Sequence, residues 1–478
     1  MTTMAQASVM RVPEGPLQTA GRRVVVVGAG ASGAAAARLL RAHGATVVLS
    51  EEKADVPEAA ALRAAGVAIE LGANRAETLA AADLIVVSPG VSLRQPAVAA
   101  AIAAGVPLIG EIELASRYLS GRIVAVTWTK GKSTTTTLIG RMLEAGGLPV
   151  TVGGNLGTPL SSQVAATGPD VVHVVETSSF QLETIAAFHP HVSVFLNFSP
   201  DHLDRHASIE EYASAKARIF ENQTAEDVAV VNAGDPAVMA MAAGGAARQM
   251  RVSATTPVTP GVSIDGGMIV ARDAQGTATP LVPVSAVRLL GPHLVEDVVA
   301  AAAVAHVLGV ASAAITGAVA GFTGLEHALE PVAEVAGVRY VNDSKATNVE
   351  AARRAIESFG PGLVVIMGGR YKGGDFRDLR APLSVRHGRV IAIGETAGRI
   401  AEALAGAVPV EAAPSIDAAV ERAAAHAAPG GTVLLAPACS SFDMFDSYAD
   451  RGHRFKRAVA RLAGIGTGES SGTDSGGT

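Results

Sequence analysis

Short runs of β-branched residues alternate along this chain with alanine-rich stretches, and this alternation limits the possible folds more than any other feature. Short apolar runs are typical of strands buried on both faces of a parallel sheet, and the stretches between them are typical of crossover helices. We therefore predict an α/β fold in which each parallel strand is followed by a helix. The predicted strands span residues 24–27, 84–87, 123–126, 171–175, 192–196, 363–367, 390–393 and 432–435.

The length of the chain predicts more than one domain. It has 478 residues, whereas single hydrophobic cores stop growing at about 250 to 300 residues. Polar motifs gather in three groups: near residue 28, near residue 130 and between residues 343 and 448. We predict three α/β domains at residues 21–119, 120–325 and 326–463. An N-terminal extension, 1–20, precedes them, and a Gly- and Ser-rich tail, 464–478, is expected to be disordered.

Charge and apolar patterning exclude several classes of function. The formal net charge of -6 leaves no basic patch for a nucleic acid. No apolar run reaches the roughly 18 residues of a membrane span, and the first 20 residues lack a signal-peptide core. The single cysteine, Cys439, cannot form an internal disulfide and is expected to pack in a core. We expect a cytoplasmic protein with neither nucleic acid nor membrane as a partner.

A glycine-rich turn follows the first predicted strand, where residues 28–33 have the sequence Gly-Ala-Gly-Ala-Ser-Gly. Backbone N–H groups at the start of the next helix can face a diphosphate there. Glu51 and Glu52 end the following strand, near the spacing at which a carboxylate reaches a ribose. The turn fits NAD, another nucleotide or plain tight packing, and the sequence leaves these three open. Ser-Pro-Gly at 88–90 is either a second ligand-binding turn or an ordinary one.

A second turn has the composition of a phosphate loop. Residues 127–134, Thr-Trp-Thr-Lys-Gly-Lys-Ser-Thr, lie between a predicted strand and a predicted helix. Gly131 lets backbone amides approach phosphate oxygens, Lys132 supplies a cation, and the Ser133 hydroxyl can bind Mg²⁺. This context favours a nucleotide over a chance match. No glycine stands five residues before Gly131, so the loop is either a shorter variant or a degraded one.

Further polar residues follow the next predicted strands. Glu176 ends one strand, where it can hold a metal beside phosphates or simply cap a helix. His202 lies in the polar segment 199–206, which is either a solvated loop or a source of a metal ligand. Lys216 lies on the helix after this loop, and by itself it predicts only a solvated side chain.

Together these blocks resemble the Mur ligase family over roughly residues 21–463. The blocks at 178–183 and 343–348 are similar to the glutamate-adding members rather than to their siblings. The matching blocks are Gly-Ala-Gly-Ala-Ser-Gly (28–33), Ser-Pro-Gly-Val (88–91), Gly-Lys-Ser-Thr-Thr-Thr (131–136), Gly-Asn-Leu-Gly (154–157), Glu-Thr-Ser-Ser-Phe-Gln-Leu-Glu (176–183), Asp-His-Leu-Asp-Arg (201–205), Ala-Lys-Ala-Arg-Ile (215–219), Asn-Asp-Ser-Lys-Ala-Thr-Asn (342–348) and Pro-Ala-Cys-Ser-Ser-Phe-Asp (437–443).

The resemblance implies an N-terminal Rossmann-like domain for a UDP-sugar, a central ATPase domain of the phosphate-loop type and a C-terminal dinucleotide-fold-like domain for glutamate. It implies a monomeric, ADP-forming ligase of peptidoglycan precursor synthesis that adds D-glutamate to UDP-N-acetylmuramoyl-L-alanine through an acyl phosphate. The sequence does not separate D-glutamate from L-glutamate, since both present the same charged groups.

The resemblance also assigns residues to ATP and to two Mg²⁺ ions. A carbamylated Lys216 is among them, because a carbamate converts a cation into an oxygen ligand for a hard metal. The ATP-binding residues are Thr129, Lys130, Gly131, Lys132, Ser133 and Thr134. The metal ligands are Ser133, Glu176, His202 and Lys216, and the catalytic residues are Lys132, His202 and Lys216.

The two remaining substrates are assigned in the same way. The implied UDP-substrate residues are Ala31, Ser32, Ser50, Glu51, Ser88, Gly90 and Asn155. The implied glutamate residues are Lys345, Thr347, Lys372, Ser441 and Tyr448, of which Tyr448 supplies an aromatic wall.

The chain departs from the family at positions that face ATP. Trp128 replaces the first glycine of the phosphate loop, and its indole must either point away or fill the space beside the phosphates. Leu294 and Asp297 stand where the family has asparagines, and Ala328 stands where it has an arginine. Three hypotheses remain open: an active ligase, a ligase-like paralogue that binds precursor without turnover, and an NAD-dependent dehydrogenase.

Overall fold

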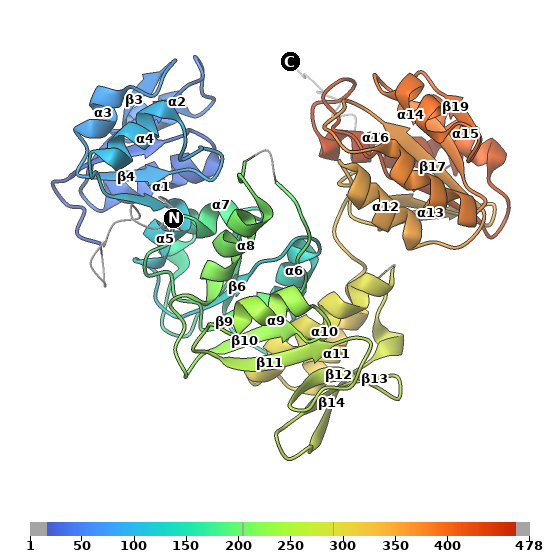
Figure 1. Ribbon diagram of the computed structural model, residues 1–478, viewed down its shortest axis with the longest axis horizontal. Coiled ribbons are helices and arrows are strands. Elements are labelled where there is room, and N and C mark those ends of the chain that lie inside the picture. Colours follow the sequence, from blue (N-terminus) through green and yellow to red (C-terminus); the bar gives the residue numbers. More distant parts are fainter. Residues whose placement is uncertain (1–16, 203–204, 290, 465–478) are drawn as a thin grey trace, which may run out of the picture. The chain divides into compact units, whose positions relative to one another are not determined.

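The computed structural model describes residues 17–202, 205–289 and 291–464, so the predicted disordered tail beyond Gly464 and most of the N-terminal extension lie outside the described residues (Figure 1). Within these ranges the strands form three sheets. The predicted α/β class is confirmed, and each predicted strand is present. Tertiary contacts divide the chain into two compact units, one from Met1–Val287 with Val295–Gly321 and the other from Arg288–Leu294 with Phe322–Thr478.

The first sheet of the first unit is parallel, with the strand order β3-β2-β1-β4-β5 of a Rossmann-like domain. Alternate residues of β1 face opposite sides: Val24 and Val26 pack against α1 and α5, while Val25 and Val27 pack against α3 and α4. The strands are β1 (Arg23–Val27), β2 (Thr46–Glu51), β3 (Ala68–Leu71), β4 (Leu84–Val87) and β5 (Leu108–Gly110). The helices are α1 (Ala31–Ala42), α2 (Ala59–Ala64), α3 (Ala76–Ala80), α4 (Pro96–Ala103) and α5 (Glu111–Ser116).

The second sheet has the order β14-β13-β12-β11-β10-β9-β6-β8-β7. Strand β13 pairs antiparallel with both β12 and β14, and the sequence reasoning missed this extension of the sheet. The strands are β6 (Arg122–Val126), β7 (Val150–Gly154), β8 (Val172–Glu176), β9 (Val192–Phe195), β10 (Val228–Asn232), β11 (Arg248–Ser253), β12 (Gly261–Asp265), β13 (Met268–Arg272) and β14 (Ala278–Pro283). The helices between residues 132 and 320 are α6 (Lys132–Ala145), α7 (Ser179–Leu182), α8 (Ile209–Ala217), α9 (Pro236–Ala242), α10 (Pro292–Val307) and α11 (Ser312–Ala320).

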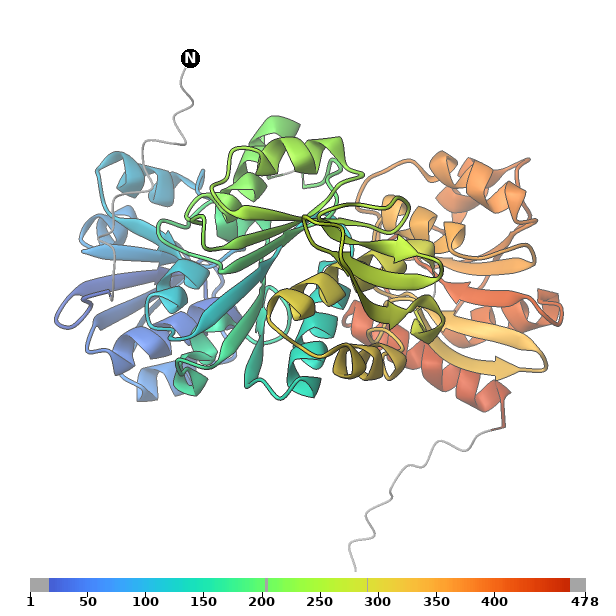
Figure 2. The same cartoon turned by 90° about the horizontal axis from the view of Figure 1, so that it is seen from below.

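The second unit contains the third sheet, ordered β15-β16-β20-β17-β18-β19, in which only β15 is antiparallel to its neighbour (Figure 2). Helices α12 to α14 share one apolar core with the sheet, and α15 and α16 share the other. The strands are β15 (Glu330–Val335), β16 (Val338–Asn342), β17 (Leu363–Gly368), β18 (Arg389–Ile393), β19 (Val410–Ala412) and β20 (Thr432–Leu435). The helices are α12 (Val349–Glu357), α13 (Arg380–Val385), α14 (Ala397–Leu404), α15 (Ile416–His426) and α16 (Tyr448–Leu462).

Burial agrees with the expected packing of the single cysteine, since Cys439 is fully buried in the second unit. Across residues 17–202, 205–289 and 291–464, no helix combines the length and the apolar character needed to cross a membrane. The domain limits near residues 120 and 326 stay predictions.

Candidate active site

Three polar segments of the first unit meet at one edge of the second sheet. Strands β8, β6 and β9 are neighbours, and Val126 at the end of β6 pairs with Glu176 on one side and Val194 on the other. The phosphate loop follows β6, Glu176 ends β8, and the segment containing His202 follows β9. Because the carboxyl ends of parallel strands share an edge, three segments that are separate in sequence come together here.

The phosphate loop ends at Gly131, the N-cap of α6, which has a φ of 109°. A Cβ at this position would lie 2.6 Å from Oδ1 of Asp297, so both backbone angle and space require glycine. Ser133 and Thr134 lie in the first turn of α6, where free N–H groups and the helix dipole favour phosphate. The Lys132 ammonium folds back over the loop and donates to the carbonyl oxygens of Trp128 (2.8 Å) and Thr129 (3.2 Å).

Trp128 is fully buried, so its indole points into the protein interior. The indole Nε1 donates to the Lys130 carbonyl oxygen at 2.6 Å, and the Asn197 amide donates to the same oxygen at 3.0 Å. In this arrangement the ring face is not open to an adenine base. The indole hydrogen bond instead joins Trp128 to Lys130 within the phosphate loop.

Trp128→Phe is expected to weaken ATP binding by about two- to tenfold, because the Lys130 carbonyl would lose one of its two donors while most of the buried ring is kept. Calorimetric titration of ATP into both proteins measures the effect. Thermal unfolding serves as the control, since a general packing defect would lower the melting temperature without a selective change in ATP affinity. Tighter binding by the variant would mean that the indole obstructs the nucleotide.

Glu176 offers an oxygen suited to a metal ion. Its side chain is 2% exposed, and its Oε1 accepts a hydrogen bond from the Asn155 amide at 2.8 Å. Its Oε2 is buried and has no hydrogen-bond partner among the described residues. A buried carboxylate oxygen without a partner is costly, and a hard cation such as Mg²⁺ would satisfy it. The donor set at this sheet edge therefore fits a magnesium ion.

Lys216 is only 2% exposed, so the simple interpretation of it as a solvated side chain is wrong. Packing of α8 against the phosphate loop decides this: Lys216 Nζ donates to the Trp128 carbonyl (3.0 Å) and to Thr127 Oγ1 (3.2 Å). Burial and the nearby charge of Lys132 hold the pKa of Lys216 well below its usual value. A neutral amine is the form that reacts with CO₂, so the site fits a carbamate.

His202 lies on the segment that follows β9, and Lys130 lies in the phosphate loop, two residues before Lys132. His202 is exposed, has a φ of 54°, and its ring centroid lies 5.1 Å from that of Phe180 in an edge-on contact. Lys130 Nζ lies 3.3 Å from Oδ2 of Asp201. The predicted catalytic residues Lys132, His202 and Lys216 thus come from three loops or helices at one sheet edge.

The first unit also contains a cleft of about 860 Å³ at the carboxyl ends of β1 and β4. Its lining includes predicted UDP-substrate residues, namely Ala31, Ser32, Glu51, Ser88, Gly90 and Asn155. Ser50 is fully buried, and its hydroxyl donates to Oδ1 of Asn74, which lines the cleft. Glu51 Oε2 accepts from the Ala29 backbone at 2.7 Å and thereby orders the glycine-rich turn.

The sequence reasoning missed two arginines of this cleft. Arg94 and Arg205 both line it, and the Arg205 guanidinium donates to the carbonyl oxygens of Gly90 and Val91. Nη2 of Arg94 donates to both carboxylate oxygens of Glu211, at 2.6 and 2.7 Å. Arg205 stands inside a block that carries the family resemblance, and Arg94 closely follows another. Their positions within or near these blocks are the sequence signal that could have identified both arginines.

The predicted glutamate residues lie in the second unit, on loops after β16, β17 and β20 and at the start of α16. These strands are neighbours, and Ala438 N donates to the Ala346 carbonyl, which joins two of the loops. Lys345 and Lys372 are exposed, Thr347 is half-buried, and Ser441 is buried. Tyr448 is 41% exposed. The structure therefore gathers the predicted cations, hydroxyls and aromatic ring at one sheet edge.

The three other departures from the family have distinct surroundings. Leu294 belongs to the apolar core of the second unit, and Ala328 is half-buried next to His327. Asp297 is 3% exposed, and burial followed by the charge of Glu296 raises the pKa of its carboxyl well above the usual value. A protonated carboxyl is neutral and can donate a hydrogen bond, as an amide can, so the change from asparagine is smaller than the sequence suggests.

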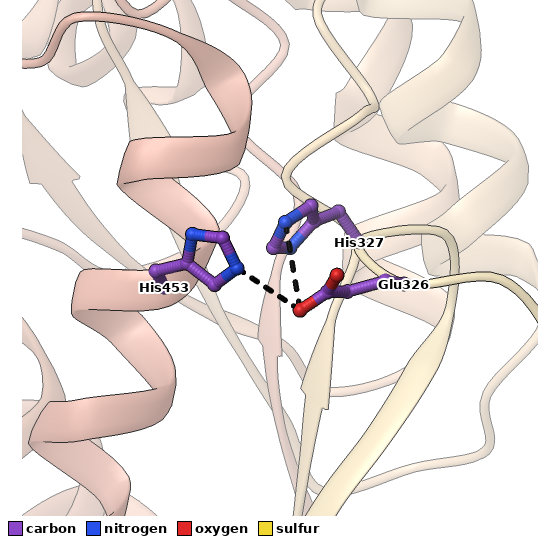
Figure 3. A group of neighbouring side chains, drawn as sticks. All are labelled: Glu326, His327 and His453. Atoms are coloured by element: carbon purple, nitrogen blue, oxygen red, sulfur yellow. Dashed lines mark hydrogen bonds and ion pairs between the residues drawn. The ribbon is translucent and has the colours of Figure 1, made fainter. Parts of the chain in front are cut away.

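Glu326, His327 and His453 form a cluster in the second unit (Figure 3). His453 Nε2 lies 3.0 Å from Glu326 Oε1, and the Lys456 ammonium lies 3.0 Å from the same oxygen. The Asn342 amide donates to His327 Nδ1 at 2.9 Å, so the neutral His327 ring carries its proton on Nε2, which faces Glu326. Since a cation and this proton already face the carboxylate, the cluster is best described as an ion-pair network that anchors α16.

Comparison with known proteins agrees with this geometry. Family models match at residues 22–110 (Mur ligase MurD-like, N-terminal domain), 126–305 (Mur ligase middle domain) and 329–439 (Mur ligase, glutamate ligase domain). A curated UDP-N-acetylmuramoylalanine--D-glutamate ligase from Acidobacterium capsulatum is 45% identical over 450 residues, covering 93% of this chain and 97% of that protein. The enzyme of that name from Pelotomaculum thermopropionicum is 45% identical, covering 92% and 98%.

Solved structures share the fold. A UDP-N-acetylmuramate-alanine ligase from Thermotoga maritima aligns with a TM-score of 0.57 at 19% identity, over 92% of this chain and 100% of that one. A MurF ligase from the same organism, solved with ADP, aligns with a TM-score of 0.56 at 18% identity, over 94% and 97%. The sheets and the matching domain models define a ligase built from three α/β domains. The chain belongs to the Mur ligase family.

Proposed function

We propose that this protein joins D-glutamate to the alanine carboxylate of UDP-N-acetylmuramoyl-L-alanine, with conversion of ATP to ADP and phosphate. The observation that carries the proposal is 45% identity over 97% of the length of a relative named for this reaction. The glutamate ligase domain model, matched at residues 329–439, supports glutamate as the incoming amino acid. Both ATP and nucleotide-linked sugars are cytoplasmic, so the reaction belongs in that compartment.

The reaction divides into two steps on the substrates. The alanine carboxylate attacks the γ-phosphorus of ATP, forming an acyl phosphate as ADP leaves. The glutamate amine then attacks the acyl carbon, loses a proton, and displaces phosphate to leave an amide. Lys132 neutralises charge on the β and γ phosphates, and the amides at the start of α6 hold their oxygens.

Two Mg²⁺ ions, when bound, would neutralise the charge that develops on the transferring phosphoryl group. We assign Ser133 and Glu176 to one ion, because the free Oε2 of Glu176 is buried at the end of β8. His202 and Lys216, as a carbamate, are assigned to the other. The low pKa of Lys216 supports this role, because a neutral amine is needed to form the carbamate.

The two remaining substrates have separate sites. The cleft of about 860 Å³ suits the UDP-sugar, with the turn at residues 28–33 and the cations of Arg94 and Arg205 facing its diphosphate. Glutamate carries two carboxylates, which we assign to Lys345 and Lys372. Thr347 and Ser441 supply hydroxyls, and Tyr448 supplies an aromatic wall.

Release of ADP in the presence of UDP-N-acetylmuramoyl-L-alanine and each glutamate enantiomer tests the proposal. Turnover with D-glutamate is expected. Turnover with L-glutamate alone would assign the opposite enantiomer. The changes at Trp128 and Leu294 favour a second candidate, a protein that binds the precursor without turnover, and precursor binding without ADP release would support it.

Lys372→Ala is expected to raise the Michaelis constant for glutamate about tenfold or more, because a charge-assisted pair with a carboxylate contributes about 1.5 to 3 kcal/mol. The Michaelis constant for ATP should change little. Steady-state kinetics with each substrate varied in turn measures both. The exposed Arg377, which lies in the next turn and pairs with Asp375, supplies the matched control Arg377→Ala. An equal rise in both constants would contradict a glutamate-specific role.

A further inference from the structure

Arg451 is a fully buried arginine in the first turn of α16. In the described part of the chain no carboxylate lies within ion-pair distance of it, and the charge of Asp443 acts on it from farther away. Burial lowers the pKa of Arg451 to about 10, so it remains charged at neutral pH. Buried charges are usually paired, because an uncompensated one is costly. An unpaired buried guanidinium therefore requires an explanation.

Among the described residues, the guanidinium donates hydrogen bonds to neutral oxygens alone, and these belong to two loops of the predicted glutamate site. Nε donates to Ser344 Oγ at 2.9 Å and Nη2 to the Ser344 carbonyl at 2.8 Å, while Nη1 donates to the Cys439 carbonyl at 3.1 Å. Ser344 Oγ in turn donates to the Tyr448 carbonyl at 2.7 Å. One side chain thereby connects the segments that carry Lys345, Ser441 and Tyr448.

The third loop of the site meets the same guanidinium. Gly369 has a φ of 138°, and a Cβ there would lie 3.3 Å from Arg451 Nη1 and 2.1 Å from the Ser440 carbonyl. The backbones of Arg370 and Ser440 exchange hydrogen bonds at 2.9 and 3.0 Å. The loop that carries Lys372 is thus held against the loop that carries Ser441, directly beside Arg451.

We propose that Arg451 is the positioning residue of the glutamate site: it holds the three loops in register, and its unpaired charge adds to the field that attracts a dicarboxylate. This inference rests on the proposed function, since it presumes glutamate as the ligand. A neutral hydrogen-bonding side chain could join the loops, but only a cation also favours an anionic amino acid. Solvent is excluded around Arg451, which strengthens that electrostatic contribution.

Arg451→Met and Arg451→Lys test the proposal in the full-length protein. The methionine variant is expected to raise the Michaelis constant for glutamate about tenfold or more, with the constants for ATP and UDP-N-acetylmuramoyl-L-alanine within twofold of wild type. The lysine variant keeps the charge but loses the forked geometry, so an intermediate rise is expected. Hydrogen exchange of residues 343–348 and 439–441, measured without substrates, should increase in both variants.

Arg386 supplies a matched control. Its guanidinium also bonds to three carbonyl oxygens, those of Phe359, Pro382 and Glu357, at the amino end of β17 rather than at the carboxyl end. Arg386→Met should lower the melting temperature without changing the glutamate constant or exchange in the two loops. Equal rises in all three Michaelis constants, or unchanged loop exchange in Arg451→Met, would overturn the proposal. Absence of ligation by the wild type would contradict the proposed function instead, while loop exchange would still test Arg451.

Discussion

Lys216→Ala is expected to reduce ligase activity by about a thousandfold or more, because it removes the carbamate assigned to the second magnesium ion. Loss of one group that stabilises developing charge typically costs about a hundred- to a thousandfold in rate. Lys216 also donates to the Trp128 carbonyl, so its removal disturbs the phosphate loop. Initial rates of ADP release, compared between wild type and variant, measure the effect.

Chemical rescue separates a lost carbamate from a damaged fold. Formate or acetate can occupy the vacated space and supply a carboxylate, so partial recovery of the Lys216→Ala variant is expected. Ser214→Ala, at an exposed position of the same helix, is the matched control and should keep wild-type activity. Full activity of Lys216→Ala without added acid would exclude a carbamate as an essential ligand.

Asp297→Asn is expected to stabilise the protein, by an amount that grows as the pH rises. The ordinary pKa of this carboxyl is 3.8, and burial raises it well above that value in the folded protein. Between these two values the unfolded chain has released a proton that the folded protein keeps, so the free energy of unfolding falls with rising pH. The slope for one such group approaches about 1.4 kcal/mol per pH unit. Asparagine does not titrate and removes this loss.

Thermal unfolding of both proteins at several values between pH 5 and pH 8 measures the difference. The melting temperature of Asp297→Asn should exceed that of wild type, and the gap should widen toward pH 8. Asp55→Asn changes an exposed aspartate of the first unit, and its melting temperature should equal that of wild type at every pH. A constant gap from pH 5 to pH 8 would mean that Asp297 holds the same charge in the folded and unfolded states.

The sequence predicted which motifs follow the carboxyl ends of strands, but it did not predict the burial or the hydrogen-bond partners of individual side chains. Val24 to Val27 form a buried strand because β-branched residues pack on both faces of a parallel sheet, and this preference is local. Strand order is not local, yet the sequence placed Lys132, Glu176 and His202 at or after the ends of predicted strands. The structure makes these strands, β6, β8 and β9, neighbours in one sheet. The meander β12 to β14 escaped prediction although β13 carries the short apolar run Met-Ile-Val-Ala, because polar residues interrupt β12 and the first half of β14 is exposed.

The sequence by itself therefore determined the α/β class, eight of the parallel strands and the family, since these depend on periodic patterns and ordered motifs. Tertiary structure decided the state of individual charged groups. Lys216 is buried because α8 packs on the phosphate loop, and Asp297 is buried because α10 brings it against Gly131. Arg451 lies against three loops that are distant in sequence and that the order of β16, β20 and β17 brings together. Burial and partners depend on contacts between distant segments, and these contacts set the pKa values and hydrogen bonds that chemistry at the site requires.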